Sequence, residues 1–382
     1  MFGRSLITLL AASAAQLAIA LPLEARANSG NSSFLPTDIG LNITYSGPHN
    51  ASLPNVAIFA TGGTIAGSSS SELDTTSYTA GVVGIAALIE AVPQLLDVAN
   101  VQGSQIINIA SESLNSTIVL QIAKFANAVL CAEGSTTDGL VITHGTDTLE
   151  ETAFLMDSVV NCGKPVVLVG AMRPSTAISA DGPANLLEAV TLAGEPDARD
   201  RGALIALNDR IGSALYTQKN NANTINTFTA VEQGNIGGFL STKPFFYYPA
   251  GQPTFKETFD ISSVNELPMV DVLYGHQSFD WKLIQEAIDN GAKGIVIAGT
   301  GAGSLSDLTI IEVERLLKQG FPIVASTKIN EGAVPAGRDW ISAGFLNPVK
   351  ARIRLQLAIA TGLDMNGIRA KFENTLVGYL DK

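Results

Sequence analysis

The sequence has few charged, aromatic, histidine and cysteine residues for a chain of 382. Charged residues make up 15% and aromatic residues 6%, whereas 46% of the chain is hydrophobic and 36 residues are glycine. This composition argues against a coiled coil, a fibrous chain or a disordered one, and favours an α/β protein with two cores. The net charge of -12 disfavours nucleic acid or an anionic membrane as a partner. A small polar substrate remains open.

Long apolar runs are absent except at the N-terminus. Arg4 precedes an apolar stretch, residues 6–20, which ends in the small-residue pattern AIA. The pattern predicts a signal peptide over residues 1–20, and therefore a protein that is secreted or held in the cell wall or periplasm, with no membrane contact after signal removal. The alternative is an uncleaved anchor, but the stretch is shorter than the roughly 20 residues that a span needs. Residues 21–52, rich in Ser, Asn, Pro and Gly, predict a propeptide or flexible arm.

Export would also affect the chemistry of the two cysteines. An oxidising compartment allows one disulfide, Cys131 with Cys162, and a metal site is the alternative. Glycosylation is expected, if the host is a eukaryote, at four Asn-X-Ser/Thr sequons, a pattern that also arises by chance: Asn31, Asn42, Asn50 and Asn115.

Short β-rich runs alternate with helical segments from residue 55 onward. Strands are expected at 56–60, 105–109, 140–143, 166–169 and 204–207, with helices at 82–92, 116–130, 149–160 and 184–193. A second set follows, with strands at 271–274, 294–298 and 322–326 and helices at 279–289, 306–318, 348–361 and after 366. The alternation predicts an α/β fold with two domains. The larger N-terminal domain, residues 53–242, has a mainly parallel sheet flanked by helices, and residues 243–268 link it to a smaller C-terminal α/β domain, residues 269–382.

Hydroxyl and carboxylate side chains follow three of the expected strands. Thr64 lies in the run TGGTIAG after the first strand, Ser111 and Glu112 follow the second, and Thr146 and Asp147 lie in HGTDTLEE after the third. Ligands of parallel sheets bind at the carboxyl ends of strands, so these side chains predict a site. Glycines beside Thr64 would leave backbone N–H groups free to stabilise an oxyanion.

Each of these runs also has a structural interpretation. TGGTIAG can be a turn whose threonines only bond locally. In HGTDTLEE, Asp147 or Thr148 can cap the next helix, with Glu150 or Glu151 completing a capping box. That interpretation explains the carboxylate but leaves Thr146 unexplained.

The sequence has no GxSxG run and no HExxH run, which disfavours a Ser-His-Asp hydrolase and a zinc peptidase. Its only imidazoles are His49, His144 and His276. A threonine nucleophile still needs a base, and a lysine or tyrosine is the better candidate. Lys219, in a polar stretch after the fifth strand, could reach the same edge and act as a base if desolvated, although a lysine is more often simply solvated.

Five motifs in order resemble the bacterial type II asparaginases: TGGTIAG, SYTAGVVG, INIASESLN, VITHGTDTLEETA and KPVVLVGAMRPSTAISADGPANL. The similarity runs from about residue 53 to 360. The resemblance implies hydrolysis of L-asparagine to L-aspartate and ammonia by threonine-based acyl transfer, with no cofactor and no metal. It also implies that residues 67–77 are a lid over the substrate.

The motifs carry the family's roles to individual positions. Thr64 matches the nucleophile and Tyr78 its activating partner. Ser111 and Glu112 match substrate-binding positions. Thr146, Asp147 and Lys219 match a second triad, in which Thr146 and Asp147 also bind substrate, and Cys131 and Cys162 match the family's cysteine pair.

The second domain departs from the family pattern. Ser278 matches a substrate-binding residue that a neighbouring subunit supplies, and the resemblance implies a homotetramer with shared active sites. However, GAVPAGRDW lacks the expected Glu, and Asp339 is the nearest acid.

Three alternative functions remain open. A glutaminase-asparaginase would have broader amide specificity, and a secreted amino-acid-binding protein would use the same pocket without turnover. A dinucleotide enzyme is suggested by Gly299, Gly301 and Gly303, but their run lacks the final glycine and an acidic ribose partner.

Overall fold

The computed structural model describes residues 33–36, 38–75 and 78–380. The expected signal peptide, the first part of the expected arm and Asn31 lie outside the described residues, as do residues 76 and 77 of the expected lid. Within the described ranges, no helix is long and apolar enough to span a membrane.

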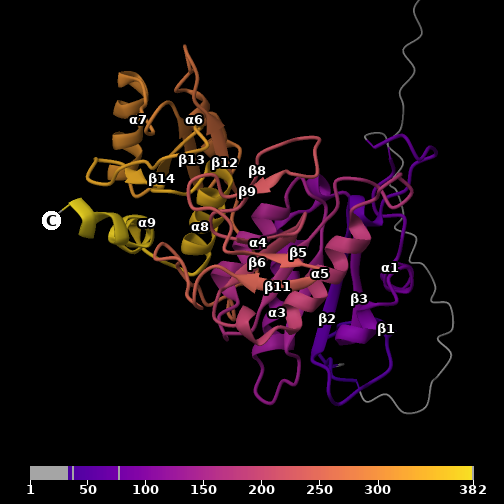
Figure 1. Ribbon diagram of the computed structural model, residues 1–382. Coiled ribbons are helices and arrows are strands. Elements are labelled where there is room, and N and C mark those ends of the chain that lie inside the picture. Colours follow the sequence, from indigo (N-terminus) through magenta and orange to yellow (C-terminus); the bar gives the residue numbers. More distant parts are fainter. Residues whose placement is uncertain (1–32, 37, 76–77, 381–382) are drawn as a thin grey trace, which may run out of the picture. The chain divides into compact units, whose positions relative to one another are not determined.

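The larger domain is built on a nine-stranded sheet in the order β1-β3-β2-β4-β5-β6-β7-β10-β11 (Figure 1). Its strands are β1 Ile43–Ser46, β2 Asn55–Gly62, β3 Asn100–Ile109, β4 Gly139–Thr143, β5 Val166–Val169, β6 Ala203–Leu207, β7 Arg210–Ser213, β10 Gly237–Leu240 and β11 Lys243–Phe246. The five from β3 to β6 pair in parallel, and the remaining pairs are antiparallel. The central strands are apolar on both faces, as strands covered on both sides must be.

Successive residues of each central strand face opposite layers of helices. Phe59 and Ile142 pack with α3, Ser116–Cys131, and α4, Leu149–Val159. Their neighbours Ile58 and Val141 pack on the other face, whose helices are α1 Ile85–Glu90, α2 Leu95–Val98 and α5 Gly182–Gly194. The period-2 alternation of strands therefore divides one sheet between two cores.

The smaller domain has a four-stranded parallel sheet, β12-β13-β14-β15. Its strands are β12 Val270–Tyr274, β13 Gly294–Gly299, β14 Ile323–Thr327 and β15 Ile341–Ser342, and its helices are α6 Leu283–Asp289, α7 Asp307–Lys318, α8 Pro348–Ala360 and α9 Met365–Leu380. Ile295 and Ile323 face the core that includes α6 and α7 residues, whereas Val296 and Val324 face the core that includes α8. These two sheets with their helices confirm the predicted fold class.

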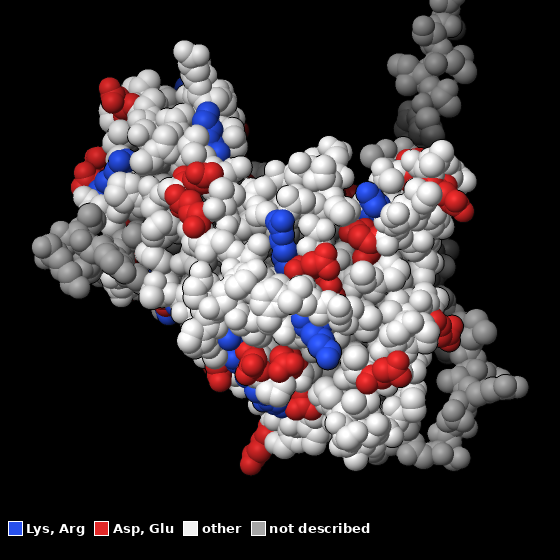
Figure 2. Space-filling view, in the orientation of Figure 1, with Lys and Arg blue, Asp and Glu red and all other residues white. Residues whose placement is uncertain are grey.

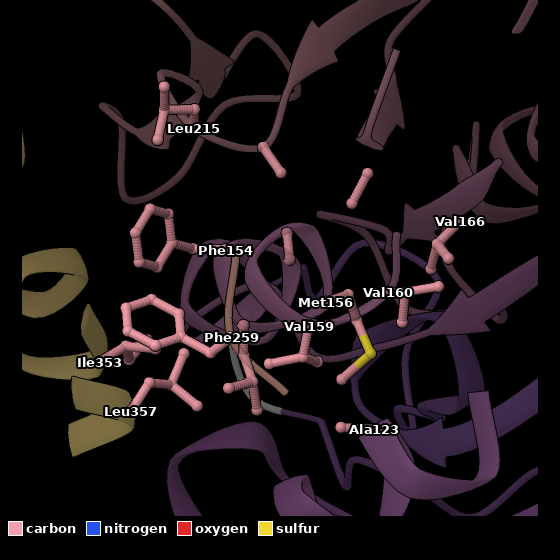
Figure 3. Packing of buried hydrophobic residues seen from close by; sticks show 14 of the residues in the cluster. Ala123, Phe154, Met156, Val159, Val160, Val166, Leu215, Phe259, Ile353 and Leu357 are labelled. Atoms are coloured by element: carbon pink, nitrogen blue, oxygen red, sulfur yellow. The ribbon is translucent and has the colours of Figure 1, made fainter. Parts of the chain in front are cut away.

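Helix α8 joins the two domains through a shared core. Ile353 and Leu357 of α8 lie beside Phe154 of α4 and Phe259, and all four belong to one cluster with Met156 and Val159 (Figure 3). At its surface, Arg352 of α8 forms an ion pair of 2.8 Å with Glu151 of α4. Helix α4 of the larger domain is therefore packed against a helix of the smaller one.

The described part of the expected arm is folded onto the large sheet. Strand β1 pairs antiparallel with β3, and Leu35 and Leu41 are buried. The Gln102 side chain of β3 accepts hydrogen bonds from the backbone N–H groups of Phe34 and Leu35, at 3.1 and 3.0 Å. The expected linker likewise begins with β11, which pairs with β10 at the other edge of the sheet.

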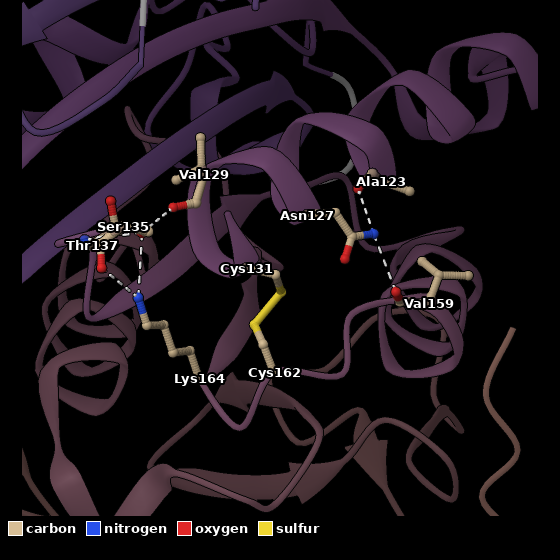
Figure 4. Close-up of a disulfide and its surroundings, with 9 residues drawn as sticks. All are labelled: Ala123, Asn127, Val129, Cys131, Ser135, Thr137, Val159, Cys162 and Lys164. Carbon is tan, nitrogen blue, oxygen red and sulfur yellow. Dashed lines mark hydrogen bonds between the residues drawn. A yellow bond between two sulfur atoms is a disulfide. The ribbon is translucent and has the colours of Figure 1, made fainter. Parts of the chain in front are cut away.

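A disulfide joins Cys131, at the C-terminus of α3, to Cys162, which follows α4 (Figure 4). Their Cα atoms are 5.5 Å apart and 31 positions separate them in the chain. Asn127 donates to the backbone oxygen of Val159 at 3.1 Å nearby, so the ends of the two helices are held by a covalent bond and a hydrogen bond.

Candidate active site

The turns that follow strands β2, β3 and β4 pack closely against one another. A Cβ atom on Gly63 would lie 2.3 Å from Gly145 Cα, and a Cβ atom on Gly145 would lie 2.7 Å from Ser111 Oγ. Gly63 also has a φ of 81°, in the region that favours glycine. The glycines therefore bring the residues that follow them, Thr64 and Thr146, to one edge of the sheet.

Thr64 begins a short 3₁₀ turn, and its side chain is buried. Its Oγ1 lies 2.5 Å from Tyr78 Oη, so the two hydroxyls form a short hydrogen bond. The Tyr78 ring packs over Gly67, where a Cβ atom would lie 2.9 Å from ring atom Cδ2. The segment between them returns beside Thr64 because Ser68 and Thr79 exchange backbone hydrogen bonds of 3.0 and 2.9 Å. The chain thus brings together the two hydroxyls that the sequence predicted as partners.

Lys219 reaches the same edge from β8, Gln218–Lys219. Its Nζ donates to Thr146 Oγ1 at 3.0 Å and to Asp147 Oδ1 at 2.5 Å. Thr146 is buried, whereas the Asp147 side chain is 62% exposed and can accept a further hydrogen bond from a ligand. The three residues of the predicted second triad therefore form one hydrogen-bonded group.

The capping box that could have explained HGTDTLEE does not form. Thr148 is the N-cap residue of α4 but makes no side-chain cap bond. Its hydroxyl donates instead to the Ser111 backbone oxygen at 3.0 Å, and Glu150 accepts from the Lys219 N–H at 3.0 Å. The carboxylates and hydroxyls of this run thus connect the strand ends to one another rather than capping the helix.

The imidazoles are not placed to activate a threonine. His144 is fully buried; its Nδ1 donates to the Gly145 oxygen at 2.7 Å, and its Nε2 accepts from Thr152 Oγ1 at 2.8 Å. Burial lowers the pKa of His144 to about 4, so the ring is neutral near pH 7 and supports the Gly145 turn. His49 and His276 are exposed elsewhere, His276 in the smaller domain.

The other predicted residues are not all gathered here. Glu112 is exposed beside the buried Ser111. Ser278, with a φ of 63°, lines a cavity of ≈ 550 Å³ at the carboxyl ends of β12 and β13, and the lining includes none of Thr64, Thr146 and Lys219. Asp339 is exposed, and its backbone oxygen accepts from Arg369 at 3.1 Å.

The three sequon asparagines that the structure describes are exposed. Asn42 and Asn50 are exposed, and Asn115 caps α3 by accepting from the Ile118 N–H at 3.0 Å.

Three residues around Lys219 were not predicted. Besides Glu150, they are Asn347, which contacts Gln218 of β8, and Lys350 in the first turn of α8, which contacts Thr217 directly before that strand. The carboxylate in HGTDTLEE was visible as a capping candidate, but nothing in the run NPVK signals a contact with residues more than 120 positions earlier.

The site offers hydroxyls, one amino group and backbone N–H groups. Across the described ranges, no three His, Cys, Asp or Glu side chains gather into a group that could hold a metal ion. Charges of both signs are scattered over the visible face, most of which is uncharged (Figure 2). The fold and site define a two-domain α/β protein with the groups of a hydroxyl-nucleophile hydrolase.

Comparison with known proteins identifies the family. Residues 55–251 match the model described as "Asparaginase, N-terminal", and residues 269–372 match "Glutaminase/Asparaginase C-terminal domain". This chain belongs to the asparaginase family.

Several curated relatives are similar over most of their length. "Probable L-asparaginase 4" of Schizosaccharomyces pombe is 47% identical over 85% of this chain and 91% of its own. "L-asparaginase 2" of Bacillus subtilis is 46% identical over 84% and 86%, and "L-asparaginase 2" of Escherichia coli is 40% identical over 84% and 93%. A solved structure, a probable cytoplasmic L-asparaginase from Campylobacter jejuni, is 41% identical with a TM-score of 0.79, over 84% of this chain and 99% of that one. These findings confirm the predictions of the family and of an L-asparaginase.

The prediction of a secreted, cell-wall or periplasmic protein is wrong against these findings. The C. jejuni chain is described as a probable cytoplasmic enzyme. The apolar stretch on which the prediction depended, residues 6–20, lies outside the described residues. An apolar stretch with small residues at its end is a compositional pattern, and it carried the whole argument for export.

Proposed function

We propose that this chain hydrolyses the side-chain amide of L-asparagine to L-aspartate and ammonia, with Thr64 as the nucleophile. The proposal depends on one observation: two threonine hydroxyls lie at the same sheet edge, and each is hydrogen-bonded to a second polar group. Thr64 Oγ1 lies 2.5 Å from Tyr78 Oη, and Thr146 Oγ1 lies 3.0 Å from Lys219 Nζ. A small-molecule amide as substrate agrees with the family, and acyl transfer to a threonine hydroxyl is chemistry that side chains can carry out.

In the first step, Thr64 Oγ1 attacks the amide carbonyl carbon. Tyr78 Oη accepts the threonine proton and passes it to the departing nitrogen, so that the C–N bond breaks and ammonia leaves. The negative charge that develops on the carbonyl oxygen is stabilised by backbone N–H groups of the glycine-rich turns. The product is an aspartyl ester on Thr64.

In the second step, water attacks the ester and restores the Thr64 hydroxyl. Lys219 and Thr146 orient this water, and one of its protons passes to Thr64 Oγ1 as the ester C–O bond breaks. Asp147 pairs with the substrate α-ammonium group through the exposed part of its carboxylate, and Ser111, with Glu112 beside it, holds the α-carboxylate.

The experiment replaces Thr64 and measures ammonia release from L-asparagine and from L-glutamine. Thr64→Ala should reduce release to the background level at an unchanged melting temperature, while Thr64→Ser should keep measurable turnover because it keeps the hydroxyl. Wild-type turnover by Thr64→Ala would mean that another group is the nucleophile. A folded wild-type chain that binds asparagine without releasing ammonia would indicate a binding protein instead. Comparable rates on both amides would favour the glutaminase-asparaginase alternative.

The domain boundaries and the assembly remain part of this proposal. The family matches at 55–251 and 269–372 support boundaries near residues 53 and 269, and strand β1, which precedes residue 53, adds an edge strand to the larger domain. A homotetramer would let a neighbouring copy's smaller domain deliver Ser278 to each site. Sugar attachment at the sequons stays a prediction.

A further inference from the structure

The strand that carries Lys219 has little support of its own. Strand β8 consists of Gln218 and Lys219 alone and pairs only with the two-residue strand β9, Phe228–Thr229. Two residue pairs fix a backbone weakly, since isolated hairpins are marginally stable in water. The position of the Lys219 amino group must therefore depend on contacts from other elements.

Lys350 supplies two of these contacts from α8. Its side chain is buried, and its Nζ donates to the backbone oxygens of Leu215 at 3.1 Å and Thr217 at 2.6 Å. One turn earlier, the side-chain amide of Asn347 donates to Gln218 Oε1 at 2.8 Å. The smaller domain therefore holds the residues directly before Lys219.

Glu150 supplies a further contact from α4. Its Oε2 accepts from the Lys219 N–H at 3.0 Å, and its charge lies close enough to Lys350 to affect it. Burial lowers the pKa of Lys350 to about 8, against the opposing effect of the Glu150 and Asp157 carboxylates. Burial likewise raises the pKa of Glu150, against the effect of Lys350. Burying both groups costs stability that an apolar pair would not cost.

The space beside the buried Lys350 side chain is too small for a substrate. The cavity that Lys350, Asn347 and Gln218 line has a volume of ≈ 30 Å³. That space holds one or two water molecules and is too small for an amino acid. Any effect of these residues on turnover must therefore pass through Lys219.

We propose that Lys350 and Glu150, with Asn347, form a clamp from the two domains that sets the position of the Lys219 amino group against Thr146. The inference rests on the proposed role of Lys219 in the reaction. Lys350 and Glu150 are positioning residues, and the clamp makes the site's geometry depend on how α8 sits against α4. Residues in the smaller domain thus affect turnover within one chain, apart from anything a neighbouring copy supplies.

The test compares Lys350→Met with Arg354→Met. Arg354 is a matched control, because it lies one turn further along α8, is equally buried, and donates to backbone oxygens remote from Lys219, those of Phe255 at 2.7 Å and Lys371 at 3.2 Å. Both variants should lower the melting temperature. Only Lys350→Met should lower kcat, by about 10- to 100-fold with little change in KM, because a small displacement of a catalytic group slows the chemical step. Equal kcat values for the two variants would overturn the clamp.

A second pair of variants covers the case in which Lys350→Met does not fold. Glu150→Gln keeps a side-chain oxygen for the Lys219 N–H, whereas Glu150→Ala removes it. The expected result is a kcat near wild type for Glu150→Gln and a loss of about 10-fold or more for Glu150→Ala. Equal kcat for these two variants would contradict the proposed contact.

A double variant separates failure of the clamp from failure of the proposed function. Lys219→Met should lose most turnover, and adding Lys350→Met to it should lower kcat no further, since the clamp acts through Lys219. If Lys219→Met kept wild-type kcat, the role proposed for Lys219 in the reaction would be wrong. If Lys219→Met lost turnover while Lys350→Met and Glu150→Ala kept it, only the clamp would fail.

Discussion

At the scale of single residues, Glu188 is a carboxyl group that the fold buries without a full set of partners. It lies on α5 with 2% of its surface exposed, and its Oε2 has no hydrogen-bond partner among the described groups. Burial, the hydrogen bond to Asp209 and the charge of Asp209 raise its pKa to about 8 from an ordinary value of 4.5. The folded chain therefore favours the protonated, neutral form of Glu188.

This environment predicts a pH dependence of stability. Between about pH 4.5 and 8, the folded state holds a proton on Glu188 that the unfolded state has lost, so stability falls as pH rises through this window. Glu188→Gln keeps the shape without the ionisation. The variant should gain roughly 2 to 6 °C in melting temperature over wild type at pH 8.5, and less at pH 5. Thermal unfolding followed by circular dichroism checks this, and an equal difference at both pH values would contradict it.

Single residues also show where sequence patterns stop being informative. Asp147 and Glu150 fit a capping box by spacing, yet both bond to Lys219. Asp147 pairs with the charged Lys219 amino group, whereas Glu150 accepts from the neutral Lys219 backbone N–H, and both partners lie some 70 positions away in the chain. Only the resemblance to a family pointed to Lys219 and Thr146 together, and no pattern pointed to Lys350.

At the scale of elements, β1 protects an exposed edge. Strand β3 is ten residues long and would be the edge of the large sheet if β1 did not pair with it. An unpaired edge of that length offers its backbone groups to other chains. The segment before residue 53 thus stabilises the domain that carries the site.

Shortening the chain tests this contribution. A chain that starts at residue 53 lacks β1 and the buried Leu35 and Leu41, whereas a control chain that starts at residue 33 keeps all three. The shorter chain should melt several degrees lower and should associate on heating, because both the edge and apolar surface become exposed. Light scattering during a thermal ramp gives the measurement. Identical melting and scattering for the two chains would mean that β1 is dispensable.

At the scale of the whole molecule, the residues predicted for the site lie in two separate places. Thr64, Thr146 and Lys219 come from the larger domain, while Ser278 lines a separate cavity in the smaller one. A site that includes both would require a second copy, which is the proposed homotetramer.

The proposed assembly gives a prediction about size and activity. Size-exclusion chromatography with light scattering should find the ammonia-releasing species at a mass near four chains. Dilution to the point of dissociation should lower turnover, and Ser278→Ala should raise KM without changing the assembly. An active monomer with wild-type KM would contradict a shared site.

Sequence alone predicted the parallel core better than the rest. Strands such as β4 and β5 are continuous apolar runs with helices between them, so each was recognised within a few residues. The antiparallel strands β1, β7, β10 and β11 were not, because none is a continuous apolar run and several contain glycine or proline. Their pairing depends on neighbours that short-range patterns do not contain.

The contact between the turns at Gly63, Gly145 and Ser111 limits how the enzyme could be altered. A side chain added at Gly63 would collide with the backbone of Gly145, and one added at Gly145 would collide with the Ser111 side chain. Efforts to change the range of accepted amides therefore have no free volume at the floor of the site. A directed search for altered amide preference would therefore leave both glycines unchanged and vary other positions.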